Sequence, residues 1–365
     1  MQQMRILFIG LLLFSATGML SQTETNNSEV SYFYGSIYKH TPDIGHLITG
    51  HPQGVLVSFN RKTYGEKEWQ RAFNYPDYGF SFQYQDFRNK YMGENFAIAA
   101  HYNFYFLKRK LVFRISQGIG MTTNPYDKET NYKNNAFGSR FMSSNLFLLN
   151  YKKERIVGPF GLQAGFIFTH FSNGRIKSPN SGINTYGINL GVNYTPDEKL
   201  PYVARDTIKK DFKEPIRYNI VLRTGISESQ IVNSGQKPFY HFGLYADKRI
   251  GRKSAMQLGT DIFLSQYLKE YIKYRSVAYP EEPYIDPNTD YKRVSLFVGH
   301  ELFISKISVE TQVGYYIYKP FDYEIDVYQR VAAKYYFHKK WFTGISLKSH
   351  AARAEAIELA IGIRL

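Results

Sequence analysis

The segment Phe160–Ser172 has the sequence FGLQAGFIFTHFS, in which two kinds of residue alternate. Its even-numbered positions are mostly apolar, and the positions between them include glycine, glutamine and threonine. Alternation with a period of two predicts a β-strand with one apolar face. His170 and Ser172 lie on that apolar face, two residues apart at the end of the strand.

The same weak alternation recurs along the chain and predicts about 14 strands, within a range of about 12–16. Two further candidates, Tyr32–Tyr38 and Pro52–Asn60, alternate less clearly. The 14 segments are Gly79–Phe87, Asn95–Leu107, Leu111–Met121, Phe141–Tyr151, Gly158–Ser172, Asn184–Tyr194, Ile216–Ile226, Phe239–Arg249, Ser254–Tyr267, Val294–Phe303, Ile307–Tyr318, Val327–Phe337, Trp341–Leu347 and Ala356–Leu365.

Composition favours a barrel in a membrane. Aromatic residues make up 17% of the chain, yet its mean hydropathy is only −0.39. Transmembrane β-barrels combine these properties, because every second residue faces a polar lumen. Short basic turns such as Lys108–Lys110 alternate with long polar loops such as Thr122–Arg140 and Lys269–Lys292. We therefore expect an all-β fold, with residues 22–365 forming a single antiparallel transmembrane barrel in the outer membrane. The charged stretch Pro196–Glu214 is unusually long for a connection on the side of the barrel that carries the short turns.

The beginning of the chain predicts export. Arg5 precedes the mostly apolar stretch Ile6–Leu20, and small residues follow, so residues 1–21 are typical of a signal peptide. A single N-terminal anchor helix is the alternative. The chain has no cysteine, which excludes disulfides, thiol catalysis and a lipoprotein anchor. The net charge of +15 favours an anionic partner, and for an exported chain a phosphate-bearing lipid surface fits better than nucleic acid.

A candidate catalytic group lies on the predicted hairpin around residue 177. Asn184 shares the apolar face of its own strand, so antiparallel pairing would place it near His170 and Ser172. A serine hydroxyl becomes a good nucleophile when a neutral imidazole takes its proton, and a third group must orient that imidazole. We therefore predict Ser172 as the nucleophile, His170 as the base and Asn184 as the orienting residue.

The turn after Ser172 carries the candidate substrate-binding groups. Asn173 and the backbone N–H groups around Gly174 are the nearest candidates for an oxyanion hole. Arg175 and Lys177 could bind a phosphate. This chemistry requires neither a cofactor nor a metal ion.

The stretch His170–Asn180, HFSNGRIKSPN, resembles the His-aromatic-Ser-Asn motif and Lys-x-Pro-Asn turn of the PagL family of outer-membrane lipid A 3-O-deacylases. The resemblance implies a β-barrel whose serine and histidine face the lipid, and a substrate that is lipid A, the anchor of lipopolysaccharide. The family's third residue is typically Glu, where this chain has Asn184. Its best-known members are eight-stranded and about half as long, so this chain resembles the long Bacteroidetes-type form, known as acyloxyacyl hydrolases.

Two other functions compete with a lipid A esterase. A porin-like or structural outer-membrane protein would also have lumen-facing charges and long loops, and a phospholipase could use the same dyad. Two further clusters contain possible ligands. One is His40, Asp43, His46 and His51, where the spacings match no regular metal site. The other is His350, Arg353, Glu355 and Glu358, which we expect to be loop and lumen residues.

Overall fold

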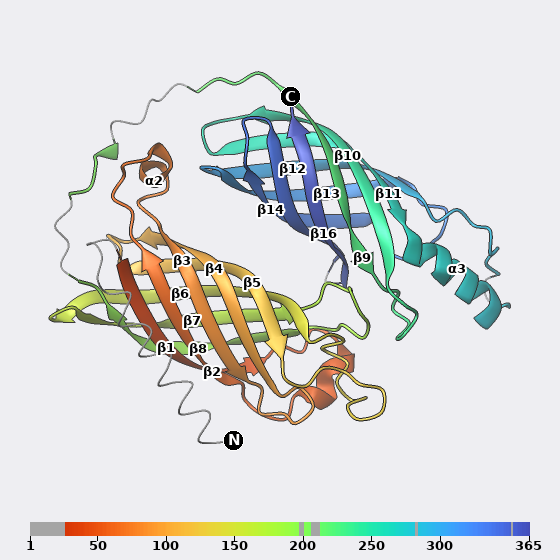
Figure 1. Cartoon of the computed structure of the whole chain (residues 1–365), viewed down its shortest axis with the longest axis horizontal. Helices are drawn as coiled ribbons and strands as arrows, with labels where there is room; N and C mark the ends of the chain where they lie inside the picture. The colour runs from red at the N-terminus through yellow and green to blue at the C-terminus, as the bar shows by residue number, and fades with distance from the viewer. Residues whose placement is uncertain (1–25, 197–200, 206–211, 282–283, 352) are drawn as a thin grey trace.

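The computed structural model describes residues 26–196, 201–205, 212–281, 284–351 and 353–365, so the predicted signal peptide lies outside the described residues. The strands form two closed antiparallel barrels (Figure 1). Barrel one consists of β1 (Asn26–Ile37), β2 (Gln53–Arg61), β3 (Asp77–Asp86), β4 (Glu94–Phe106), β5 (Leu111–Thr122), β6 (Phe141–Val157), β7 (Phe160–Ser172) and β8 (Ile183–Tyr194). Barrel two consists of β9 (Arg217–Ser227), β10 (Lys237–Arg249), β11 (Ser254–Ser265), β12 (Arg293–Ile304), β13 (Ile307–Tyr318), β14 (Val327–Tyr336), β15 (Trp341–His350) and β16 (Arg353–Arg364).

The division into two barrels differs from the single barrel of about 14 strands that the sequence predicted. In β1, Val30 pairs with Val57 of β2 on one side and with Val192 of β8 on the other, which closes barrel one. Strands β9 and β16 close barrel two in the same way. Alternation defines the two faces of each strand but not the partner of the first strand, so it did not predict where closure occurs. Strand β8 ends at Tyr194 and β9 begins at Arg217, so the charged stretch Pro196–Glu214 falls between the two barrels in the sequence, and its residues 197–200 and 206–211 lie outside the described residues.

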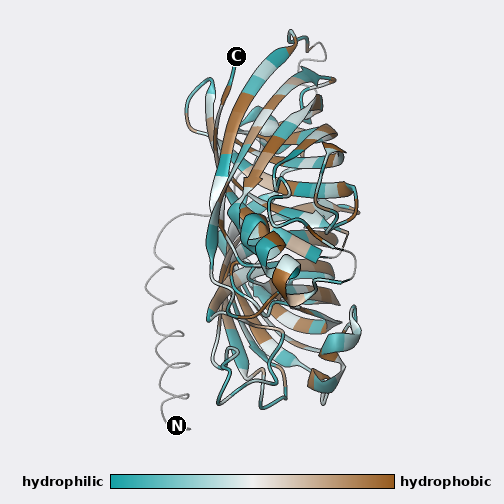
Figure 2. Cartoon of the chain, turned by 90° about the vertical axis from the view of Figure 1, so that its right-hand side faces the viewer, coloured by the Kyte–Doolittle hydropathy of each residue, from teal (hydrophilic) through white to brown (hydrophobic). Residues whose placement is uncertain are grey.

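The outward and inward faces of the barrels have opposite polarity. On β8, Ile188 and Leu190 are 63% and 65% exposed, whereas Asn189 and Asn193 are buried in the lumen. Figure 2 shows the resulting alternation of hydrophobic and hydrophilic bands along the strands. An apolar outer wall around a polar interior is the arrangement of a transmembrane β-barrel, as the sequence predicted.

Both lumens contain buried ion pairs, packed among other buried polar and aromatic side chains. In barrel one, the Glu29 carboxylate lies 2.6 Å from Arg114 Nη2 and 2.8 Å from Lys152 Nζ. In barrel two, Arg330 binds Asp261 at 2.6 Å and Glu358 at 2.7 Å. Eight strands enclose a space that side chains can fill completely. This packing does not favour a porin-like channel.

The two ends of each barrel differ, and we call them the turn end and the loop end. Short hairpins such as Leu107–Lys110 lie at the turn end, together with the 62–76 connection that contains α2 (Glu68–Ala72). The loop end carries the longer connections, with η1 (Pro42–Leu47) in barrel one and α3 (Gln266–Ala278) in barrel two. The sequence predicted a loop where most of α3 lies. Among the described residues, no helix is long and apolar enough to span a membrane.

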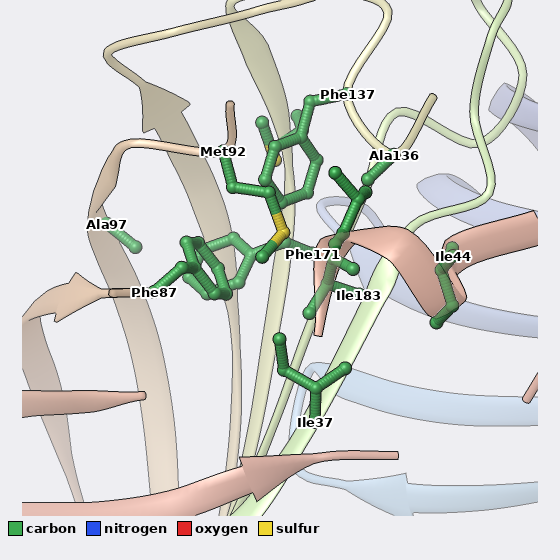
Figure 3. Packing of buried hydrophobic residues seen from close by; sticks show 11 residues of the cluster. Ile37, Ile44, Phe87, Met92, Ala97, Ala136, Phe137, Phe171 and Ile183 are labelled. Atoms are coloured by element: carbon green, nitrogen blue, oxygen red, sulfur yellow. The ribbon is translucent and has the colours of Figure 1, made fainter. Parts of the chain in front are cut away.

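An apolar cluster closes the loop end of barrel one directly behind the predicted site (Figure 3). Phe171 of β7 and Ile183 of β8 point into this cluster and are fully buried. They pack with Phe87, Phe137 and residues of η1. Because Phe171 lies between His170 and Ser172, and Ile183 precedes Asn184, the cluster anchors the backbone that carries all three predicted catalytic residues.

Candidate active site

His170 and Asn184 face each other across the β7–β8 ladder, as the sequence predicted. The two residues are register partners, and His170 Nδ1 lies 2.6 Å from Asn184 Oδ1. An amide oxygen only accepts hydrogen bonds, so Nδ1 of the ring must carry the proton. The other ring nitrogen, Nε2, is then free to accept a proton. The geometry thus fixes the tautomer that a general base requires.

Ser172, the last residue of β7, is held by the turn that follows it. Its Oγ accepts hydrogen bonds from Asn180 Nδ2 at 3.0 Å and from the Gly174 N–H at 3.1 Å. It also donates to Asn180 Oδ1 at 3.3 Å. Among the described residues, the hydrogen bonds of Ser172 Oγ therefore go to Asn180 and Gly174 and not to His170. No role was expected for Asn180 from the sequence, although it ends the motif that carries the family resemblance.

Ser172 and the His170 ring nevertheless adjoin one small space. A Cβ placed on Gly182 would lie 3.2 Å from Ser172 Cβ and 3.5 Å from His170 Cε1. The absence of a side chain at Gly182, whose φ is +67°, therefore leaves room between the serine and the edge of the imidazole. A change of the Ser172 χ1 rotamer is a low-energy movement that re-aims Oγ within this space.

The predicted oxyanion groups have different surroundings. The Asn173 side chain is buried and donates to Ser139 Oγ and to the Lys177 carbonyl, so it stabilises the turn. The Asn173 N–H donates to Asn180 Oδ1. By contrast, the Gly174 N–H donates to Ser172 Oγ at 3.1 Å and is, with Asn180 Nδ2, one of two donors beside the nucleophile oxygen.

The two predicted phosphate ligands, Arg175 and Lys177, also differ in their surroundings. Lys177 is exposed in the turn. The Arg175 side chain is only 12% exposed and lies 3.3 Å from Glu324, with its guanidinium 4.6 Å from the centre of the Tyr267 ring in barrel two. Burial alone would lower the pKa of Arg175, but Tyr267 and Glu324 raise it above its ordinary value, so the group is charged. Its Nη1 donates to Glu324, whereas the buried Nε and Nη2 have no hydrogen-bond partner among the described residues, so phosphate binding by Arg175 stays a prediction.

His40 approaches the site from the other side of Asn184. Asn184 Nδ2 donates to His40 Nδ1 at 3.2 Å, and His40 Nε2 lies 3.0 Å from the Ser181 carbonyl. The remaining members of the His40–His51 cluster point elsewhere, since His46 contacts the Lys133 carbonyl and His51 the Gly35 carbonyl. From the sequence, His40 was only a possible ligand in that cluster, because nothing local marked it as a neighbour of residue 184.

The second cluster, around His350, belongs to barrel two. Glu358 is buried in the lumen, as its position in the alternation predicted, and Glu355 is buried among Arg293, Lys348 and Tyr267. Glu324, His350 and Glu355 bring ligand atoms close together. The cations that already pair with these carboxylates leave little reason to propose a metal ion there.

Two family models match the chain, and the matched segments follow the two barrels. The model described as lipid A 3-O-deacylase (PagL) matches residues 53–193, and the model described as the acyloxyacyl hydrolase C-terminal domain matches residues 216–365. The fold and these matches define a membrane β-barrel of the acyl ester hydrolase class. The chain belongs to the PagL family of lipid A 3-O-deacylases, in a form that carries the additional C-terminal domain.

Similar solved structures are mutants of the porin of Rh. blastica. A double mutant of that porin is 11% identical, with 93% of this chain and 99% of that chain covered and a TM-score of 0.20. A triple mutant is 9% identical over the same shares, with a TM-score of 0.21. These scores support no inference about function. No curated protein matches the sequence.

Proposed function

We propose that the protein is an outer-membrane serine esterase that removes an ester-linked 3-hydroxyacyl chain from lipid A. The main support is the tautomer-fixing contact between His170 and Asn184, next to Ser172 on the outward face of a PagL-family barrel. In this proposal, Ser172 is the nucleophile and His170 the base. Lipopolysaccharide is the membrane partner, and the loop end faces the cell exterior.

The reaction proceeds in two half-reactions. His170 Nε2 takes the hydroxyl proton while Ser172 Oγ attacks the ester carbonyl, and the Gly174 N–H stabilises the oxyanion. The sugar alkoxide then leaves with the proton from His170, and an acyl-enzyme remains. A water molecule, deprotonated by His170, releases the fatty acid and restores Ser172. Asn184 holds the ring but carries no charge to stabilise the imidazolium.

The outer wall of barrel one provides a route for the substrate. Below His170, the same face of the hairpin carries Phe166, Tyr186 and Ile188, which are 67%, 53% and 63% exposed. An acyl chain can lie along these side chains without leaving the hydrocarbon. The exposed Lys177 in the turn can then contact a lipid A phosphate.

The test is lipid A mass spectrometry in a host that expresses the protein. Wild-type protein should produce a species that lacks one hydroxyacyl chain, and Ser172→Ala and His170→Ala should abolish that species while the barrels stay folded. Continued deacylation by either folded variant would contradict the proposal. Purified phospholipid and lipid A, offered side by side, separate a phospholipase from a lipid A esterase.

A further inference from the structure

The turn that follows Ser172 reaches from barrel one to the loop end of barrel two. Its Arg175 carbonyl accepts hydrogen bonds from the Glu228 N–H at 3.0 Å and from Ser227 Oγ at 3.2 Å. The next carbonyl, of Ile176, accepts from Gln236 Nε2 at 3.0 Å. Ser227 ends β9, so the backbone of the turn is attached to the first strand of barrel two and to the loop after it.

Side chains reinforce this attachment at both ends of the turn. The Ser178 N–H donates to Glu228 Oε2 at 2.7 Å, and Ser178 Oγ donates to the Ser229 carbonyl at 2.6 Å. Glu228 is itself buried and fixed by the Gly235 N–H. At Gly174, a Cβ would lie 2.3 Å from Ile357 Cγ1 of β16, so the turn packs closely against the wall of barrel two.

The Arg175 side chain adds a charged contact between the turn and barrel two. Its guanidinium lies over Tyr267 of α3 and pairs with Glu324 from the β13–β14 loop. Glu324 also binds Arg293 at 2.8 Å, which links the pair to the buried charges at the mouth of barrel two. Truncating Arg175 would therefore leave Glu324 with one cation fewer and the Tyr267 face uncovered.

The same turn supplies the groups that surround the nucleophile. Gly174 and Asn180, which bind Ser172 Oγ, flank the segment 175–178 that barrel two holds. The position of the proposed oxyanion donor thus depends on a contact with the other barrel. We propose that barrel two is a positioning domain for the esterase, and that Arg175 is the positioning residue that fixes the catalytic turn through Glu324 and Tyr267.

This inference rests on the proposed function, and kinetics with purified lipid A tests it. Arg175→Ala and Glu324→Gln should each lower kcat by about 10- to 100-fold with KM nearly unchanged, because a misplaced oxyanion donor affects the transition state. The kcat of the double variant should be no lower than that of the more impaired single variant, because both changes break the same contact. Arg175→Lys should recover part of the rate. The matched control is Lys292→Ala, which removes an exposed cation at the same end of barrel two and should leave kcat unchanged.

A second readout separates positioning from substrate binding. A fluorophosphonate that labels reactive serines carries no lipid A headgroup, so a mere phosphate ligand would not affect its reaction. We expect Arg175→Ala and Glu324→Gln to slow labelling of Ser172. Unchanged labelling, or a rise in KM at constant kcat, would overturn the positioning role. If the Arg175 and Glu324 variants retain full activity while Ser172→Ala has none, this inference fails and the proposed function stands. If Ser172→Ala retains activity, the proposed function itself fails.

Discussion

Nδ1 of His170 lies 2.6 Å from Oδ1 of Asn184, in a family whose third residue is typically a carboxylate. The amide fixes the ring and its tautomer as a carboxylate would, but it offers no negative charge to the imidazolium that forms during attack. In the proposed site, the imidazole is therefore oriented but has no carboxylate beside it to stabilise its positive charge.

Substitutions at Asn184 separate these two contributions. Asn184→Glu should preserve or raise the rate of lipid A deacylation, because it keeps an acceptor for Nδ1–H and adds charge. Asn184→Leu removes the acceptor and should lower kcat by about 10- to 100-fold. Initial rates on purified lipid A provide the measurement, with thermal unfolding as the control for folding. A large loss in a folded Asn184→Glu variant would argue against the orienting role.

His40 determines which way the Asn184 amide points. Because Nδ2 donates to His40 Nδ1 at 3.2 Å, Oδ1 is left to face His170. His40→Ala should lower deacylation by about 3- to 10-fold, the scale of one hydrogen bond. A glutamate has two equivalent oxygens and needs no such partner, so His40→Ala should have little effect in an Asn184→Glu background. Equal losses in both backgrounds would show that His40 acts in another way.

Gly182 keeps the space between the serine and the imidazole open. Gly182→Ala introduces a methyl group 3.2 Å from Ser172 Cβ and also strains a backbone with φ of +67°. Gly158→Ala is the matched control, because its φ is +55° and nothing lies within 4 Å of the new Cβ. Both should lose about 1–2 kcal/mol of stability from strain. In a serine-labelling and deacylation assay, only Gly182→Ala should also lose activity, and similar activity losses in both variants would point to strain alone.

Local alternation predicted most strands and their faces. Phe166 is outward and exposed, as its place on the apolar face of Phe160–Ser172 indicated, and Glu358 is buried in the lumen, as expected. The two weaker strand candidates correspond to β1 and β2. The position of His170 opposite Asn184 was also predicted, because both residues belong to one hairpin and share the same face of its strands. These features depend on residues close together in the sequence.

Features that depend on residues far apart in the sequence could not be predicted from local alternation. The alternation within β1 does not reveal which strands pair with it. The two closed barrels were therefore predicted as a single barrel. The contacts of Arg175 with Tyr267 and Glu324 could not be predicted, because these partners lie far along the chain in another barrel. His40 was missed for the same reason, since 144 residues separate it from Asn184.

Barrel two contains a buried serine–histidine–carboxylate group, whereas the proposed site in barrel one has the amide of Asn184 as its third member. Its His241 Nδ1 lies 2.7 Å from Glu358 Oε1, and its Nε2 lies 3.1 Å from Ser265 Oγ. All three side chains are buried in the filled lumen, and Arg330 and Ser346 also bind the Glu358 carboxylate. A lipid ester has no route to this serine, so we expect the group to stabilise barrel two.

Ser265→Ala should therefore leave lipid A deacylation unchanged and lower stability by about 1–2 kcal/mol, because His241 loses a buried hydrogen-bond partner. Ser172→Ala should show the opposite behaviour, with loss of activity and little change in unfolding. Peptide mapping after fluorophosphonate treatment gives an independent measurement, since the adduct should form on Ser172 alone. An adduct on Ser265, or loss of deacylation in a folded Ser265→Ala variant, would mean that the lumen opens to substrate and that the outward-facing residues are not the whole site.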